Sequence, residues 1–427
     1  MLPPGPTRSP LANLQRFARD PYGVFWDAAA EFGPVFGVQI AGQPAWVSVG
    51  EPASIEQIFR GGSDEFLAAT DVTLPGALAL LDDERSPTFR GERIAGHARS
   101  IAACVDAVVE RLRPGQRVRA SALMASITAR ATVECVIGIH DPTRRDRLLA
   151  LLEAEAEHLR APAWPLATLL AGGAERLGPL SHFAFTRTRR ALRALIAAEI
   201  QQRHRDPSGR DDLLALLIEH RDERGLGSSD AELLDRAMAI LIDAHDGSAL
   251  SLAWALWLLS GHRAHRERVL DEAREPGQGS RMIEAVIDET LRMRPVAHHT
   301  ARRLARPLEL GEWSLPAGTY TLASQAVTHF RADLWDSPFE FRPERFSSAT
   351  RPSPFVYFPF AGGARIGLGR SFALLQMRVI LQRLLQRLEL RVAVDADPRP
   401  APCGLLIGPS DGVPIVIETI HSALAPT

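Results

Sequence analysis

Residues 358–375 read FPFAGGARIGLGRSFALL and are the most informative stretch of the chain. The first half is rich in glycine and lacks periodicity, whereas the second half repeats apolar residues as a helix does. The stretch therefore predicts a loop leading into a helix that runs from about Gly369 to Leu388. A glycine-rich turn before a helix also suits phosphate binding. No βαβ unit surrounds this one, which disfavours that interpretation.

The middle of the chain, residues 95–291, is mostly helical by the spacing of its apolar residues. Its longest periodic run, residues 231–262, contains Asp243, His245 and Asp246 and is too polar for a membrane span. We therefore expect a central helix that is buried on most sides.

Short strands are expected at both ends of the chain. Residues 32–50 and 306–324 alternate apolar and polar side chains and carry turn glycines, and a terminal hairpin should follow the last helix. Without internal repeats or obvious linkers, the simplest prediction is one mainly α-helical domain, residues 1–427, with small β-sheets.

Composition excludes several functions. The net charge is -2, which gives no field for nucleic acid. All 49 basic residues are arginine, so no lysine can form a Schiff base. Cys104, Cys135 and Cys403 match neither a disulfide framework nor a metal cluster, so no metal is expected. The N-terminus lacks an apolar signal, and we expect a cytoplasmic protein without a transmembrane segment.

Residues 161–180, APAWPLATLLAGGAERLGPL, are apolar and interrupted by proline and glycine. They could be a loop packed on the core or a mobile lid over a lipophilic pocket, and the sequence does not decide between the two.

Three motifs in order give the chain its family resemblance. Glu289 and Arg292 lie three apart on one helix face, Arg345 follows in FRPERF, and the loop FPFAGGARIGLG comes next. Each motif is weak alone, but their order and spacing on a chain of this length resemble the cytochrome P450 family. The resemblance implies the P450 fold, with a long central helix and a haem-cradle loop before a C-terminal helix.

The resemblance also assigns roles to charged residues. In the family, the counterparts of Glu289, Arg292 and Arg345 form a buried triad, which implies that these residues are structural. Haem propionates are bound by arginines, and the matching positions are Arg365, Arg303 and Arg90. Each could bind a substrate anion instead, or be a solvated charge. The family usually has an aromatic residue or histidine four residues before Arg90, and this chain has Ser86.

The loop departs from the family where haem is ligated. In the family pattern F-x-x-G-x-R-x-C-x-G, the cysteine thiolate binds the iron and favours O–O cleavage. Here Phe360, Gly363, Arg365 and Gly369 are in place, but Gly367 occupies the cysteine position. A glycine has no side chain to ligate iron, so we expect no cysteine thiolate.

The central helix departs as well. The family has an acid and a threonine above the haem, and these align with Asp246 and Gly247. Ser248 is a neighbouring hydroxyl, but it lies about 100° further around the helix. Burial in an apolar pocket would raise the pKa of Asp246 and suit it to act as a general acid. His245 is expected to be an ordinary helix polar group, and its use as an iron ligand is disfavoured.

Three functions remain open. The first is acid-catalysed, non-oxidative conversion of a lipophilic small molecule in bacterial secondary metabolism, by cyclisation, rearrangement or elimination, without a cofactor. The second is a non-catalytic activator of a partner enzyme, because some bacterial P450 relatives without the haem ligand activate glycosyltransferases. The third is a haem protein, an oxidoreductase or monooxygenase, without cysteine ligation. Fold alone does not choose among them.

Overall fold

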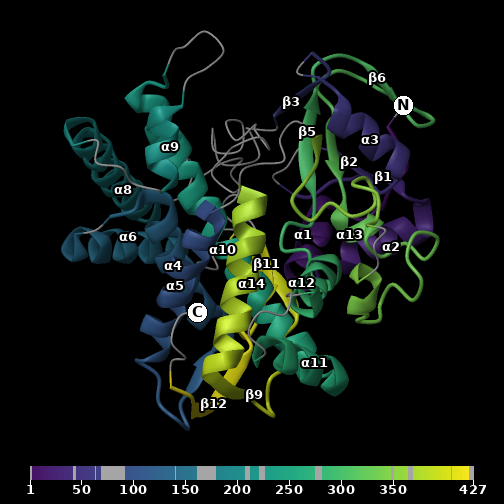
Figure 1. Cartoon of the computed structure of the whole chain (residues 1–427). Helices are drawn as coiled ribbons and strands as arrows, with labels where there is room; N and C mark the ends of the chain where they lie inside the picture. The colour runs from purple at the N-terminus through teal and green to yellow at the C-terminus, as the bar shows by residue number, and fades with distance from the viewer. Residues whose placement is uncertain are drawn as a thin grey trace.

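The computed structural model in Figure 1 describes most of the chain. The described residues are 2–41, 45–62, 64–68, 92–139, 141–160, 179–206, 212–220, 227–274, 281–347, 351–363, 369–404 and 406–422.

Helices make up most of the described chain. They are α1 (Pro10–Arg19), α2 (Gly23–Phe32), α3 (Pro52–Arg60), α4 (Glu92–Val109), α5 (Ala120–Thr132), the π-helical η3 (Val133–Ile137), α6 (Pro142–Arg160), α8 (Pro179–Arg205), α9 (Leu213–Glu219), α10 (Asp230–Ser260), α11 (Arg263–Arg274), α12 (Arg281–Met293), α13 (Gln325–Thr328), the 3₁₀ turn η5 (Pro343–Phe346) and α14 (Gly369–Arg387).

The strands are short and gather in small sheets. They are β1 (Val35–Val38), β2 (Trp46–Val49), β3 (Phe66–Ala68), β4 (Arg117–Arg119), β5 (Thr300–Leu304), β6 (Leu308–Leu310), β7 (Trp313–Leu315), β8 (Tyr320–Ala323), β9 (Leu388–Val392), β10 (Pro400–Cys403), β11 (Leu406–Pro409) and β12 (Pro414–Ile420).

The largest sheet has the order β1-β2-β8-β5-β3. Its β1 and β2 pair antiparallel with Val35 opposite Val49, whereas β2 and β8 pair parallel with Trp46 opposite Tyr320. The other sheets are β4-β12-β9, the hairpin β10-β11 and the hairpin β6-β7. Figure 1 shows the large sheet on one side of the molecule and α6 and α8 side by side on the other.

The central helix α10 forms because its start is capped and its interior is apolar. The Ser229 hydroxyl accepts from the Glu232 N–H at 3.3 Å, and the Glu232 carboxylate accepts from the Ser229 N–H at 2.8 Å. This reciprocal capping satisfies two donors at the helix start. Trp254 is fully buried, and one core cluster holds side chains from α4, α5, α8, α10 and α14.

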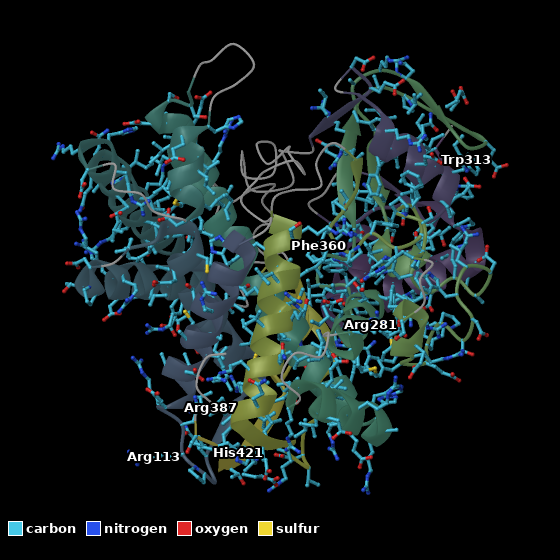
Figure 2. The ribbon with its side chains drawn as sticks, in the orientation of Figure 1. Arg113, Arg281, Trp313, Phe360, Arg387 and His421 are labelled. Atoms are coloured by element: carbon cyan, nitrogen blue, oxygen red, sulfur yellow. The ribbon has the colours of Figure 1, made fainter. Side chains whose placement is uncertain are left out.

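The predicted fold class is confirmed: the chain is mainly helical with small sheets, and its central helix and C-terminal helix fall where the sequence placed them. Figure 2 shows Phe360 near one end of α14 and Arg387 towards the other. The C-terminal part is richer than one hairpin, because β12 also pairs with β9 and β4. The 161–178 part of the candidate lid lies outside the described residues.

One described stretch, Ala120–Ile137, is long and apolar enough to cross a membrane by length and composition alone. It is 61% buried inside the molecule, and Ile127 and Ala131 belong to the main core. Burial in the core explains its apolar character.

Candidate functional site

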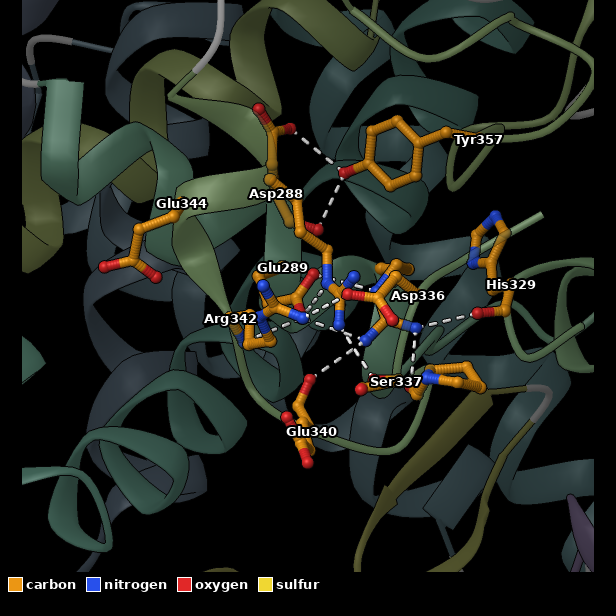
Figure 3. Close-up of polar contacts among 12 residues, drawn as sticks. Asp288, Glu289, His329, Asp336, Ser337, Glu340, Arg342, Glu344 and Tyr357 are labelled. Atoms are coloured by element: carbon orange, nitrogen blue, oxygen red, sulfur yellow. Dashed lines mark hydrogen bonds and ion pairs between the residues drawn. The ribbon is translucent and has the colours of Figure 1, made fainter. Parts of the chain in front are cut away.

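Glu289 and Arg292, near the end of α12, lie together with Arg345. Figure 3 shows Glu289 at the centre of this group of polar contacts. The Glu289 carboxylate accepts from Arg292 Nε at 2.8 Å and Nη2 at 2.9 Å, and from Arg345 Nε at 3.3 Å. Neither Glu289 nor Arg292 is exposed to solvent. Arg292 Nη1 also donates to the His329 and Pro338 carbonyls at 2.7 and 2.8 Å. A buried charge needs this many partners, and the contacts tie α12 to the segment before η5.

A second polar cluster holds Tyr357 close to this triad (Figure 3). The Tyr357 hydroxyl donates to the Asp288 carbonyl at 2.9 Å and lies 3.0 Å from its Oδ1. Burial, followed by the charge of Asp288, raises the pKa of Tyr357 well above its ordinary value of 10. Tyr357, the tyrosine nearest the loop in sequence, is therefore a neutral phenol whose hydroxyl is hydrogen-bonded to Asp288.

The described start of the loop packs tightly on α3. A Cβ at Gly363 would lie 1.9 Å from the Phe59 carbonyl oxygen, and Gly363 has a φ of +79°. Only glycine fits this position without a shift of the backbone. The Phe358 N–H donates to His329 Nε2 at 3.2 Å. The loop is therefore anchored on α3 and on His329 before it reaches residue 364.

The middle of α10 has open space at Gly247. Among the described residues, a Cβ built there would meet Val296 Cγ2 alone, at 3.9 Å. The Gly247 carbonyl accepts from the Ser251 hydroxyl at 2.8 Å. Ser248 is buried. His245 belongs to α10, but its side chain lies outside what the structure describes.

The charge of Asp246 acts on a buried carboxyl of another helix. The pKa of Glu155 on α6 is raised above its ordinary value, chiefly by burial. Arg189 of α8 lowers this pKa, and the charge of Asp246 raises it. Glu155 is 2% exposed, and its Oε1 lies 3.9 Å from Arg189 Nη1. Asp246 is partly exposed. The buried acid of α6 therefore responds to the charge of Asp246 as well as to its own ion pair with Arg189.

Strand β5 carries Arg303 beside two histidines. The Arg303 guanidinium lies 5.8 Å from the centre of the Tyr320 ring. Side chains alternate along a strand, so Arg303 shares its face with Ala301 and with His299 just before the strand. The His298 and His299 ring centres are 4.0 Å apart, and His298 Nε2 and His299 Nδ1 are buried without a hydrogen-bond partner.

These imidazoles are neutral. Burial, with a smaller effect of His299, lowers the pKa of His298 well below 6.5, and burial lowers that of His299 to about 4. A neutral imidazole offers one N–H donor and one acceptor nitrogen. The face of β5 therefore carries a guanidinium and an imidazole that could hold a carboxylate.

Two of the three cysteines, Cys104 and Cys135, are buried. Burial raises the pKa of Cys104 to about 12 and that of Cys135 further, so both are inert thiols. Cys403, at the end of β10, packs against Leu250 and Trp254 of α10. Among the described residues, no group of three or more His, Cys, Asp or Glu side chains could hold a metal ion.

Arg365, Gly367 and Arg90 lie outside the described residues, so their predicted roles stay predictions. The structure brings together the triad residues, and it places Arg303 over the Tyr320 ring. Sequence reasoning missed Glu155 and the histidine pair. The signal for Glu155 was its spacing: it follows the buried Leu148 and Leu152 by seven and three residues, so it shares their apolar face.

Comparison with known proteins identifies the family. Residues 99–414 match the family model described as cytochrome P450. Cytochrome P450 135B1 of Mycobacterium tuberculosis is 31% identical over 448 residues, covering 99% of this chain and 93% of that protein. Cytochrome P450 137 of the same species is 37% identical over 275 residues, covering 62% and 55%. The chain belongs to the cytochrome P450 family.

Solved structures share the fold. The retinoic acid-bound cyanobacterial CYP120A1 superposes with a TM-score of 0.80 at 22% identity, covering 98% of this chain and 99% of that chain. The P450DA heme domain superposes with a TM-score of 0.81 at 20% identity, covering 99% and 98%. At this level of identity the likeness concerns the fold.

The expectation that the chain binds no cofactor is wrong. Membership of the cytochrome P450 family and the fold of P450 heme domains imply haem binding. The physical reason is that Gly367 removes only the side chain that would ligate iron. Haem affinity also comes from burial of the apolar porphyrin and from contacts of its propionate carboxylates, and these are spread over several elements.

The described residues fit the porphyrin. The face of α10 has no side chain at Gly247, and Val296 stands opposite it, which suits a flat apolar group. Arg303, which lies opposite Tyr320 on β5, would hold a propionate. Residues 364–368 of the loop read ARIGL and contain no cysteine, histidine, methionine or tyrosine. An axial ligand from that part of the loop therefore does not fit.

Proposed function

We propose that this P450-family protein carries out an acid-catalysed, non-oxidative conversion of a lipophilic small molecule, by cyclisation, rearrangement or elimination, rather than thiolate-haem monooxygenation. One observation carries the proposal. The acid of the central helix, Asp246, is present and partly exposed, whereas its neighbour Gly247 has no hydroxyl. Gly367, which occupies the cysteine position of the family pattern, also argues against thiolate-haem monooxygenation.

In such a reaction each side chain has a separate role. Asp246 donates a proton to an alkene, alcohol or epoxide, and the resulting carboxylate accepts a proton when the product forms. Leu250, Trp254 and Val296 form an apolar cluster beside Gly247 that excludes water from a cationic intermediate. Haem, when bound, supplies an iron centre.

The test is turnover of the holoprotein with a panel of terpenoid alkenes, alcohols and epoxides, followed by mass spectrometry. Products should have the mass of the substrate, or that mass less water. Asp246→Asn should lower turnover by about 100-fold or more, the usual size of a general-acid contribution. The matched control is Asp235→Asn on the same helix, which removes an ion pair with Arg193 at a half-exposed site and should leave turnover unchanged.

Two results would contradict this function. One is full activity in Asp246→Asn, and the other is incorporation of oxygen from labelled O₂ into the product. Co-purification with a biosynthetic enzyme such as a glycosyltransferase, with equal activation by the wild type and Asp246→Asn, would favour the non-catalytic partner role.

A second candidate is a haem-binding oxidoreductase with an axial ligand other than cysteine, and family membership favours it. Titration of the purified protein with haemin should produce a Soret band that saturates at one equivalent. The reduced carbon monoxide complex should lack the thiolate-type band, because the loop offers no thiolate. Gly367→Cys should create that band. A thiolate-type band in the wild-type protein would show that another cysteine ligates the iron.

A further inference from the structure

Arg294, the residue that follows α12, is a cation that no carboxylate pairs with among the described residues. Its Nη1 donates to the neighbouring Met293 carbonyl at 2.9 Å. Its Nε is buried and has no hydrogen-bond partner in the described part of the chain. Two residues earlier, Arg292 has what a buried guanidinium needs, because it is paired with Glu289 and donates to backbone carbonyls. Arg294 therefore lacks an acceptor and a negative charge.

The guanidinium of Arg294 lies over the indole ring of Trp254 in α10. Its central carbon is 5.2 Å from the ring centre, a cation–π contact that leaves the indole N–H unused. Trp254 is fully buried, and its Nε1 has no hydrogen-bond partner among the described residues. Arg294 Nε is one bond, roughly 1.3 Å, from the guanidinium carbon, and Trp254 Nε1 is an atom of the ring itself. Two unused buried donors are therefore neighbours.

The surroundings of these donors are neutral and apolar. The buried Tyr22 hydroxyl donates to the carbonyl of Pro295, the next residue after Arg294, at 3.0 Å. Leu250 and Val296 form one apolar cluster with Trp254. Burial lowers the pKa of Arg294 below its ordinary value. A guanidinium nevertheless stays protonated in a protein, and a buried charge without a partner is costly.

The rim of this apolar cluster is partly exposed. Three partly exposed apolar side chains pack against it: Trp257, Cys403 and Leu406. Arg294 is also partly exposed. The Ile407 N–H donates to the Val296 carbonyl at 2.8 Å, which holds β11 against the segment that carries Arg294. A ligand that entered at this rim would meet a cation, two N–H donors and apolar side chains.

We propose that Arg294 and Trp254 form a binding site for the carboxylate of a small lipophilic acid. One carboxylate oxygen accepts from Arg294 Nε and the other from Trp254 Nε1, while the apolar tail packs on Cys403 and Leu406. A carboxylate fits because it brings two acceptor oxygens and one negative charge, and its bonds to a guanidinium are charge-assisted. The site uses neither Asp246 nor haem, so it stands independently of the proposed function.

The experiment is a calorimetric titration of the holoprotein with octanoate. Octan-1-ol, which has the same tail without the charge, and acetate, which has the charge without the tail, are the matched probes. Octanoate should bind more tightly than either. Arg294→Gln and Trp254→Phe should each weaken octanoate binding by about tenfold or more, because each removes a hydrogen bond to a charged group.

A second measurement locates the bound acid. In protein labelled with nitrogen-15 tryptophan, Trp254→Phe identifies the Trp254 indole resonance by its disappearance. Octanoate should shift that resonance downfield, because Nε1–H gains an acceptor. The matched control is Arg60→Gln, which removes another guanidinium that lies over a ring, at 5.4 Å from the centre of Phe355, but at an exposed position. This variant should bind octanoate as the wild type does.

Thermal unfolding of each variant shows whether it is folded, and the wild-type titrations decide the proposal even where a variant is not. Equal affinity for octanoate and octan-1-ol would overturn it, because the cation would then contribute nothing. Equal affinity for acetate and octanoate would overturn it as well, since the site would then select a small anion only. An unmoved Trp254 resonance, or unchanged affinity in folded Arg294→Gln, would show that the acid binds elsewhere.

Discussion

Gly247 illustrates how much one side chain matters inside a helix. A glycine in a helix interior costs about 0.5–1 kcal/mol relative to alanine, because the unfolded chain loses more freedom. At this position a Cβ would meet Val296 Cγ2 at an ordinary contact distance of 3.9 Å. Nothing in the described packing therefore demands glycine there, in contrast to Gly363, where a Cβ would run into the Phe59 backbone.

Gly247→Ala should therefore raise the free energy of unfolding by about 0.5–1 kcal/mol, measured by denaturant titration. Gly96→Ala in α4 is the control, because a Cβ there meets no described atom within 4 Å and the gain should be similar. Loss of stability in Gly247→Ala alone would mean that the space beside Val296 is needed in the folded protein.

At the scale of elements, apolar periodicity predicted the helices well. The run 231–262 became α10 (Asp230–Ser260), and the helix after the loop became α14 (Gly369–Arg387). These predictions succeeded because helical hydrogen bonds are local and amphipathic spacing is read along a single element. The β1–β2 ribbon was predictable for the same reason, since its strands are neighbours in sequence.

What the sequence could not show is which distant elements meet. The parallel pairing of β2 with β8 joins segments far apart in the chain, and no local pattern encodes it. Glu155 is a partial case: its spacing puts it on the apolar face of α6 with Leu148 and Leu152, but only the tertiary structure shows that this face is buried at the glutamate. The triad at Glu289 was foreseen through the family's motifs, not through local pattern.

At the scale of the whole molecule, buried neutral histidines make the free energy of unfolding depend on pH. Burial, more than the charge of Arg292, lowers the pKa of His329 to about 3, and His298 and His299 are also lowered. The unfolded chain, with histidine pKa values near 6.5, takes up these protons first. The stability contributed by each neutral imidazole is therefore complete above about pH 6.5 and is lost as the pH falls below that value.

We expect the free energy of unfolding to fall between pH 6.5 and pH 4 by about 1.4 kcal/mol per pH unit for each such histidine. For His329 the reason is direct, since protonated Nε2 cannot accept the Phe358 N–H. Denaturant titrations at several pH values measure the slope. His329→Gln should reduce this slope by about 1.4 kcal/mol per pH unit, the contribution of one histidine. The variant should also be less stable than the wild type at neutral pH. An unchanged slope in that variant would show that His329 is already charged in the folded protein.

The sheet that pairs β2 with β8 also has a consequence for how the protein is made. Trp26 Nε1 donates to the Ala326 carbonyl, 300 residues further along, and Arg331 Nη1 donates to the Gly50 carbonyl, 281 residues back. A ribosome must therefore synthesise three quarters of the chain before β2 can pair with β8. Until then the β1–β2 ribbon lacks its native neighbour on the β2 side, and an unpaired strand edge favours aggregation of the growing chain.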